Sequence, residues 1–115
     1  MRGPWLRYLT PLAQSEVRAL AKHLAALPPN ELGFTICQGA NGLTRGPVAH
    51  GTPTSVNVRV QCPVGSQMLG IYHTHPGGTS RPSSTDVHSA VSMGAKVLCV
   101  QSDRDGLQCY RMKVK

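Results

Sequence analysis

Between Met68 and Asp86 the chain reads MLGIYHTHPGGTSRPSSTD, and this stretch decides the fold. Residues 68–73 are nearly all apolar, which is typical of a central strand covered on both faces. Residues 76–82 are rich in glycine, proline and serine and predict a turn-rich loop. A helix is expected next over residues 84–95, with its apolar side chains on one face. A buried strand, a loop and a helix in succession indicate a layered α/β domain.

Towards the N-terminus, the pattern predicts one more helix and three more strands. Apolar residues recur at three- and four-residue spacing over residues 11–27, as in an amphipathic helix. The two prolines that follow end this helix, because proline lacks the amide donor and clashes with the preceding turn. Strands are expected over residues 32–37, 48–50 and 56–61, the last with valines alternating with polar residues.

Towards the C-terminus, two further strands are expected over residues 96–101 and 107–114. The turn between them contains Asp105-Gly106, and an Asp-Gly pair between apolar runs is a strong hairpin signal. The complete order is therefore helix, strands, helix, strands. This order predicts one mixed sheet in a single domain over residues 1–115, a length that leaves room for one domain.

The chain is strongly basic. It has 12 lysines and arginines against five aspartates and glutamates, a net charge of +7 and an isoelectric point near 9.8. Such a protein attracts nucleic acid, anionic membranes or acidic protein partners. The basic residues are scattered from Arg2 to Lys115, however, and aromatic residues are only 4% of the chain, too few for a platform that stacks single-stranded nucleic acid. A solvated surface is the favoured interpretation, and nucleic acid is not a favoured partner.

The sequence contains no segment approaching the about 18 apolar residues that span a bilayer, and its N-terminus lacks the apolar core of a secretory signal. We therefore expect a cytoplasmic protein without a membrane partner. The four cysteines form no Cys-x-x-Cys pair, which argues against a structural zinc site: Cys37, Cys62, Cys99 and Cys109. Three of them lie in apolar, strand-like runs, where a free thiol acts as a small buried hydrophobe. Their spacing does not decide whether any of them form disulfides.

Two histidines and an aspartate are the candidate metal ligands of the sequence. His73 and His75 stand at i and i+2 at the end of the central strand, so they point to the same face about 6.6 Å apart along the chain. Asp86 lies on the first turn of the next helix, and the loop allows it to fold back over the strand end. Two imidazoles and one carboxylate would leave the fourth position of a tetrahedral Zn²⁺ open to water, as in hydrolytic zinc centres.

Each of these residues also has a purely structural explanation. A histidine at a strand end is commonly a surface residue, and Ser83 with Asp86 fits the capping box that starts a helix. Separate explanations must still account for two same-face histidines, a tight loop and one of only five acidic residues. Their joint occurrence favours a metal site.

The spacing of these residues resembles the motif of the JAMM metalloprotease family, also called MPN+ or JAB. The motif here is His73-Thr74-His75, followed after seven residues by Ser83 and after two more by Asp86. The resemblance extends more weakly over residues 11–114, because these domains also place a helix before the first strand. It implies a JAB/MPN fold, which is cytidine-deaminase-like: one curved mixed sheet flanked by the N-terminal helix and the metal-site helix. It also implies one catalytic Zn²⁺ per chain, with His73, His75 and Asp86 as metal ligands.

The resemblance further implies two catalytic residues, Glu31 and Ser83. The family has a glutamate at the start of its first strand, and Glu31 opens the apolar run that leads through Gly33. The first glycine stands two residues after Glu31, whereas the family pattern is Glu-x-x-Gly. Glu16, the other glutamate, is expected on the solvent face of the first helix. Glu31 would act as general base, and Ser83 would donate a hydrogen bond to the oxyanion.

The resemblance therefore implies a zinc-dependent metalloprotease or isopeptidase. Family members cut peptide or isopeptide bonds at the C-terminal tail of a ubiquitin-like or sulfur-carrier protein, and the short stretch between Glu31 and His73 is similar to that of minimal prokaryotic members. A non-catalytic MPN-type scaffold and a nucleic-acid-associated module stay open as alternatives. A zinc nucleoside deaminase is excluded, because the chain lacks His-x-Glu with Pro-Cys-x-x-Cys. The substrate-binding residues and the oligomeric state are open, a homodimer included.

Overall fold

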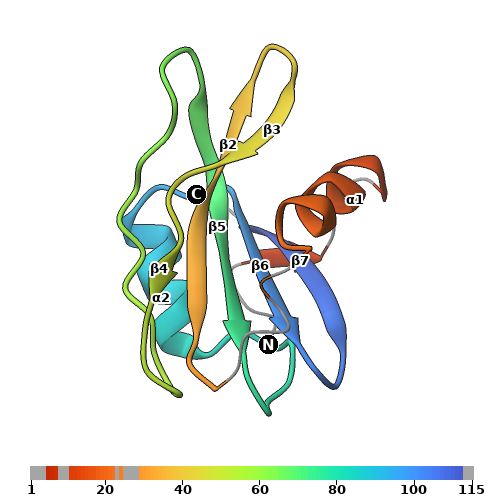
Figure 1. Ribbon diagram of the computed structural model, residues 1–115, viewed down its shortest axis with the longest axis vertical. Coiled ribbons are helices and arrows are strands. Elements are labelled where there is room, and N and C mark those ends of the chain that lie inside the picture. Colours follow the sequence, from red (N-terminus) through yellow and green to blue (C-terminus); the bar gives the residue numbers. More distant parts are fainter. Residues whose placement is uncertain (1–4, 8–10, 23, 25–28, 113–115) are drawn as a thin grey trace.

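The computed structural model describes residues 5–7, 11–22, 24 and 29–112. Within these residues, seven strands form one sheet in the order β1-β7-β6-β5-β2-β3, and β4 also pairs with β2 (Figure 1). The strands are β1 (Trp5–Arg7), β2 (Leu32–Gly39), β3 (Gly42–Arg45), β4 (Ala49–His50), β5 (Gln67–His75), β6 (Val97–Ser102) and β7 (Gly106–Met112). The helices are α1 (Pro11–Leu20) and α2 (Ser84–Ser92).

The sheet is mixed, as the order of elements predicts. β5 and β6 run parallel, and the other paired strands are antiparallel. A parallel pair needs a crossover connection, and α2 supplies it between β5 and β6. β5 lies between β6 and β2 in the interior of the sheet. The prediction of a central strand from its apolar sequence is therefore confirmed.

The two helices cover opposite faces of the sheet (Figure 1). Alternation along β5 sorts its side chains between these faces, because Tyr72 packs in the cluster under α1 and Ile71 in the cluster under α2. Tyr72 is fully buried and stacks on Phe34 with ring centroids 4.5 Å apart. The same alternation directs His73 and His75 towards the face that α2 covers.

Helix α2 is defined by its caps. Ser83 is the N-cap: its hydroxyl accepts from the Asp86 amide at 3.0 Å, and the Asp86 carboxylate accepts from the Ser83 amide at 2.8 Å. At the other end, Gly94 has φ +79° and the amides of Gly94 and Ala95 bond back to the last turn. The helix therefore ends at Ser92, three residues before its predicted end.

The predicted strand over residues 56–61 is wrong. Residues 51–63, called the covering segment below, form neither helix nor strand and lie across the face of the sheet that α2 also covers. Both edges of β2 are already occupied, by β5 on one side and by β3 and β4 on the other. Residues 59–61 of the covering segment bond instead to a side chain: the Thr35 hydroxyl donates to the Arg59 carbonyl and accepts from the Gln61 amide, each at 3.2 Å.

Three shorter elements also differ from expectation. α1 ends at Leu20, where residues 21 and 22 form a turn, and the predicted end at residue 27 lies outside the described residues. The sequence pattern does not predict β1 and β3, because strands of three and four residues are too short to display alternation. The predicted hairpin turn over residues 103–106 is confirmed between β6 and β7.

All four cysteines are paired. Cys99 and Cys109 are directly opposite each other on β6 and β7, and their sulfurs form a disulfide inside the core. Cys37 on β2 is joined to Cys62, which fastens the covering segment to the sheet. The sequence spacing could not predict these disulfides, because the pairing of cysteines depends on which strands become neighbours.

Opening the disulfides is expected to destabilise the fold. In the chain-entropy view, a bridge that spans a separation of 25 residues contributes about 3 kcal/mol to the free energy of unfolding. Urea unfolding of wild-type protein with and without reductant measures the combined effect. A Cys37→Ala/Cys62→Ala variant and a Cys99→Ala/Cys109→Ala variant assign the effect to each bridge. An unfolding midpoint that does not change on reduction would contradict this pairing.

Candidate metal centre

Two neighbouring strands bring one carboxylate and two imidazoles together. His73 and His75 project from the end of β5, and their ring centroids are 4.9 Å apart. Gly33 of β2 is directly opposite His73, so Glu31, two residues earlier, lies beside the histidines. Glu31, His73 and His75 each offer one ligand atom, and these atoms all lie within 4.8 Å of one another. The three residues form a possible metal-binding site.

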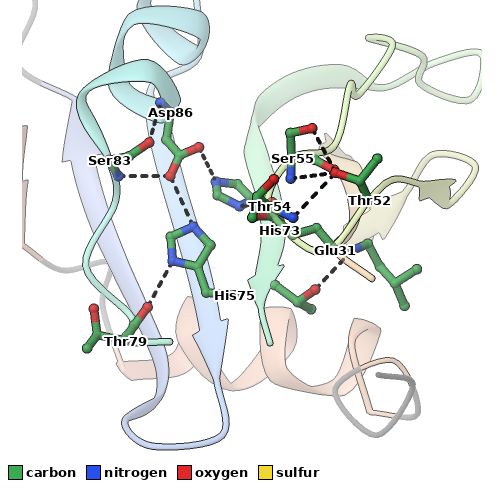
Figure 2. A network of polar contacts seen from close by, with 11 residues as sticks. Glu31, Thr52, Thr54, Ser55, His73, His75, Thr79, Ser83 and Asp86 are labelled. Carbon is green, nitrogen blue, oxygen red and sulfur yellow. Dashed lines mark hydrogen bonds and ion pairs between the residues drawn. The ribbon is translucent and has the colours of Figure 1, made fainter. Parts of the chain in front are cut away.

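Asp86 reaches the same point from the first turn of α2 (Figure 2). Its Oδ2 is 3.1 Å from His75 Nε2, and its Oδ1 is 3.6 Å from His73 Nε2. The Glu31 Oε1 atom lies 3.7 Å from the other nitrogen of His73, Nδ1. The structure therefore brings all four of these predicted site residues together, with a carboxylate on either side of the His73 ring.

The burial of these groups fits a bound cation. His73 is only 4% exposed and Glu31 only 6% exposed. The His73 Nδ1 atom is buried without a hydrogen-bond partner among the described residues, although buried polar atoms are normally paired. Two imidazoles with carboxylates are a donor set that Zn²⁺ accepts. The residues present therefore fit a divalent transition metal.

Electrostatic contacts keep the Asp86 carboxylate ionised. Burial alone would raise its pKa, but the hydrogen bond from His75, the charge of His73 and the two contacts with Ser83 lower the pKa to about 2. The hydrogen bond to Asp86 raises the pKa of the His75 imidazole, against the opposing effect of burial. A negative carboxylate is thus available at neutral pH.

The orientation of His75 is fixed by its second nitrogen. Nδ1 lies 2.9 Å from the Thr79 carbonyl oxygen, and a carbonyl oxygen can only accept, so Nδ1 donates. Nε2 faces the Asp86 carboxylate, which can only accept, so Nε2 donates to it when the ring carries both protons; a ring protonated on Nδ1 alone would present the Nε2 lone pair to a metal ion. The next residue of the loop, Ser80, is buried, and its hydroxyl is 2.9 Å from that of Ser102 on β6. Sequence reasoning missed Thr79, Ser80 and Ser102, because no motif marks them.

Glu31 is held from the covering segment through its backbone. Its amide donates to the Thr52 carbonyl and its carbonyl accepts from the Gly51 amide, both at 2.8 Å. The absence of a side chain at Gly33 lets the segment approach, because a Cβ there would lie 2.5 Å from Val58 Cγ2. This contact explains why a glycine follows Glu31 at this spacing.

Ser83 lies at the edge of the site. Its oxygen accepts from the Asp86 amide, so the hydroxyl hydrogen remains available for donation. Glu16 lies elsewhere, on α1, and the expectation of a solvent-facing side chain there is wrong. It is half-buried, and its Oε1 accepts from the Leu43 amide of β3 at 3.1 Å. Glu31 is therefore the only one of the two glutamates near the histidines.

Comparison with known proteins matches this architecture. The family model of prokaryotic homologues of the JAB domain matches residues 13–113. The crystal structure of a JAB1/MPN domain protein from Archaeoglobus fulgidus superimposes with a TM-score of 0.51 at 21% sequence identity, covering 90% of each chain. A comparison with curated proteins gives no match. In the part of the chain that the structure describes, neither helix is long and apolar enough to cross a bilayer.

Proposed function

Because the chain belongs to the family of prokaryotic JAB-domain homologues, we propose that it is a zinc-dependent hydrolase that cleaves a peptide or isopeptide bond. JAB/MPN proteins include metalloisopeptidases and also non-catalytic members. The observation that carries the catalytic choice is the meeting of four side chains at one point: Asp86 contacts Nε2 of both His73 and His75, and Glu31 faces the unpartnered Nδ1 of His73. A scaffold would have no need for this set of side chains.

In this proposal His73, His75 and Asp86 hold one zinc ion, and Glu31 does not ligate it. A zinc ion there would supply Lewis acidity, which acidifies a water molecule and polarises the scissile carbonyl. The ionised Asp86 carboxylate and the two fixed imidazoles are the groups that would bind and orient it.

Glu31 acts as the general base and then as the general acid. Its carboxylate takes a proton from the attacking water while the water oxygen bonds to the scissile carbonyl carbon. When the carbon–nitrogen bond breaks, Glu31 returns that proton to the leaving amine. The two backbone hydrogen bonds with the covering segment hold the main chain from which this carboxylate projects.

Ser83 stabilises the oxyanion that forms on the carbonyl oxygen. Its hydroxyl hydrogen is free to donate, and its position at the N-terminus of α2 adds the positive end of the helix dipole. Charge that develops only in the transition state is stabilised there without reorganisation of the site.

Replacement of Ser83 by glycine is expected to lower kcat by about 10²–10³-fold, the usual cost of losing one oxyanion donor. Glycine keeps most of the N-cap stability, within a few tenths of a kcal/mol, so the effect is not one of folding. Ser83→Thr retains a hydroxyl and serves as the rescue variant. Steady-state kinetics of both variants, with circular dichroism as a check on α2, give the answer. An unchanged kcat in Ser83→Gly would remove Ser83 from the mechanism.

The proposed substrate is the C-terminal tail of a ubiquitin-like or sulfur-carrier protein. The net charge of +7 supports an acidic partner through long-range attraction.

Hydrolysis of carrier fusions tests the proposal. Purified protein is loaded with zinc and incubated with carrier–peptide and carrier–lysine fusions, with and without a chelator. We expect cleavage at the tail that the chelator stops and added zinc restores. Metal uptake without cleavage of any fusion or peptide would favour the scaffold class, and no metal uptake would refute the zinc site.

A further inference from the structure

The loop that follows β5 is fastened to the β6–β7 hairpin by one buried residue, Ser80. The Ser80 amide donates to the Asp105 carboxylate at 3.0 Å, and the Ser80 carbonyl accepts from the Tyr110 hydroxyl at 2.9 Å. The Ser80 hydroxyl contacts the Ser102 hydroxyl and the Gly106 carbonyl. All four partners lie on β6, on β7 or in the turn between them. The amide, carbonyl and hydroxyl of Ser80 are therefore all bonded to the hairpin.

The hydroxyl groups of this contact have one possible direction. The Gly106 carbonyl can only accept, so the Ser80 hydroxyl donates its single hydrogen to it. Ser80 Oγ then accepts from the Ser102 hydroxyl, and Ser102 Oγ accepts from the Asp105 amide at 2.9 Å. Ser80 is only 2% exposed and Ser102 only 5% exposed. A buried network in which every member is satisfied holds the loop in one arrangement against the hairpin.

One peptide group joins this hairpin to the candidate metal centre. The carbonyl of Thr79 and the amide of Ser80 are the two polar ends of the same planar peptide unit. Its carbonyl end accepts from His75 Nδ1 at 2.9 Å (Figure 2), and its N–H end donates to Asp105. Because the peptide unit is rigid, a contact that fixes its N–H end also fixes the direction of its carbonyl. Asp105 is thus linked to the His75 ring through a single peptide unit.

Formation of the turn does not explain the direction of the Asp105 side chain. An aspartate in a tight turn commonly bonds its own backbone two residues on. The carboxylate of Asp105 instead accepts from Ser80, which is 25 positions away in the sequence. Asp103 belongs to the same turn, is exposed and makes no contact with Ser80. Of the two aspartates in the turn, Asp105 alone supports the loop of the metal centre.

We infer that Asp105 is a positioning residue for the metal centre. Through the peptide unit of Thr79 and Ser80 it holds His75 with Nδ1 as the hydrogen-bond donor, which keeps Nε2 as the nitrogen that can ligate an ion. The inference rests on the proposed function only in taking His75 as a zinc ligand. A group bonded to the second nitrogen of a ligating histidine orients the ring, and losing such support commonly lowers metal affinity by about 10–100-fold.

Zinc affinity in two variants of Asp105 tests the inference. Asp105→Ala removes the acceptor of the Ser80 amide and is expected to weaken zinc binding by about 10–100-fold, measured by competition with a chromophoric chelator. Asp105→Asn should keep most of the affinity, because its side-chain oxygen can still accept from that amide. An affinity in Asp105→Ala equal to that of wild type would overturn the inference. Equal losses in Asp105→Ala and Asp105→Asn would also overturn it, because charge and not position would then be responsible.

Asp103→Ala is the matched control. It removes the same charge from the same turn but leaves the contact with Ser80 intact, so its zinc affinity should equal that of wild type. Equal losses in Asp103→Ala and Asp105→Ala would show a general electrostatic effect and would overturn the inference. Urea unfolding of all three variants shows whether each one is folded under the conditions of the zinc titration.

Exchange of a ring proton of His75 separates this inference from the proposed hydrolase activity. In zinc-free protein, the Nδ1 proton is assigned with His75→Ala, and its exchange with water is followed by nuclear magnetic resonance. We expect exchange about 10-fold faster in Asp105→Ala than in wild type, Asp103→Ala or Asp105→Asn, the factor expected when one supporting hydrogen bond is lost.

This measurement needs neither bound zinc nor cleavage of a substrate. Faster exchange in Asp105→Ala alone supports the positioning role even if no fusion is hydrolysed. Unchanged exchange in Asp105→Ala overturns that role even if wild-type protein binds zinc and hydrolyses carrier fusions.

Discussion

Replacement of Glu31 by glutamine is expected to lower kcat by about 10²–10⁴-fold, the usual contribution of a positioned general base. The amide cannot take a proton from water, yet it has nearly the same shape as the carboxylate. In the proposed arrangement Glu31 is not a metal ligand, so the variant should retain one zinc per chain. The rate is measured on the best carrier fusion, and zinc is measured on the same sample by elemental analysis.

The zinc content decides between two arrangements of the site. Glu31 lies in the compact group with His73 and His75, whereas Asp86 approaches the same histidines from α2. Loss of zinc in Glu31→Gln would make Glu31 a ligand and require another base, and full activity would remove it from the reaction. Glu16→Gln is the matched control, because its amide oxygen can still accept from Leu43 and it lies outside the site.

Loss of an imidazole or of the Asp86 carboxylate should abolish both zinc binding and turnover. In His75→Ala and Asp86→Asn we expect the affinity for zinc to fall by at least about 100-fold, since loss of an outer-sphere partner alone commonly costs 10–100-fold. Asparagine is chosen for Asp86 because its oxygen can still accept from the Ser83 amide, so the start of α2 is kept. His88→Ala is the control, since His88 is exposed on the same helix.

Competition with a chromophoric chelator measures these affinities. Thermal unfolding gives an independent reading, because zinc at about 100 times its dissociation constant stabilises a protein by about 2.7 kcal/mol. Wild type and His88→Ala should show this stabilisation, and the two site variants should not. Equal zinc affinity in His75→Ala and wild type would show that the ion binds elsewhere.

The centre of the fold and the site could be predicted because the decisive information is local. The apolar run of β5 specifies a buried strand, and the alternation of side chains puts His73 and His75 on one face whatever lies beside the strand. Ser83 and Asp86 are fixed relative to each other by the capping box, which four consecutive residues encode. The role of Glu31 was predicted only from the resemblance to a family, because its position beside His73 depends on which strands pair.

Three of the differences between sequence and structure have one physical cause, which is the choice of neighbouring elements in the sheet. Apolar and polar side chains alternate over residues 56–61, as in a strand. Both edges of β2 are occupied by other strands, however, so these residues form no strand and Val58 packs on the face of the sheet. The Cys99–Cys109 bridge and the role of Glu16 in bonding β3 likewise follow from which elements become neighbours. A single sequence does not contain that information in any short segment.

The covering segment contacts both the proposed general base and a neighbouring cavity. Its residues Gly51 and Thr52 hold the backbone of Glu31, and a few positions later Val56 and Val58 line a cavity of about 340 Å³ that His73 and Asp86 also line. An insertion or deletion in the covering segment would therefore shift Glu31 and change the size of this cavity together.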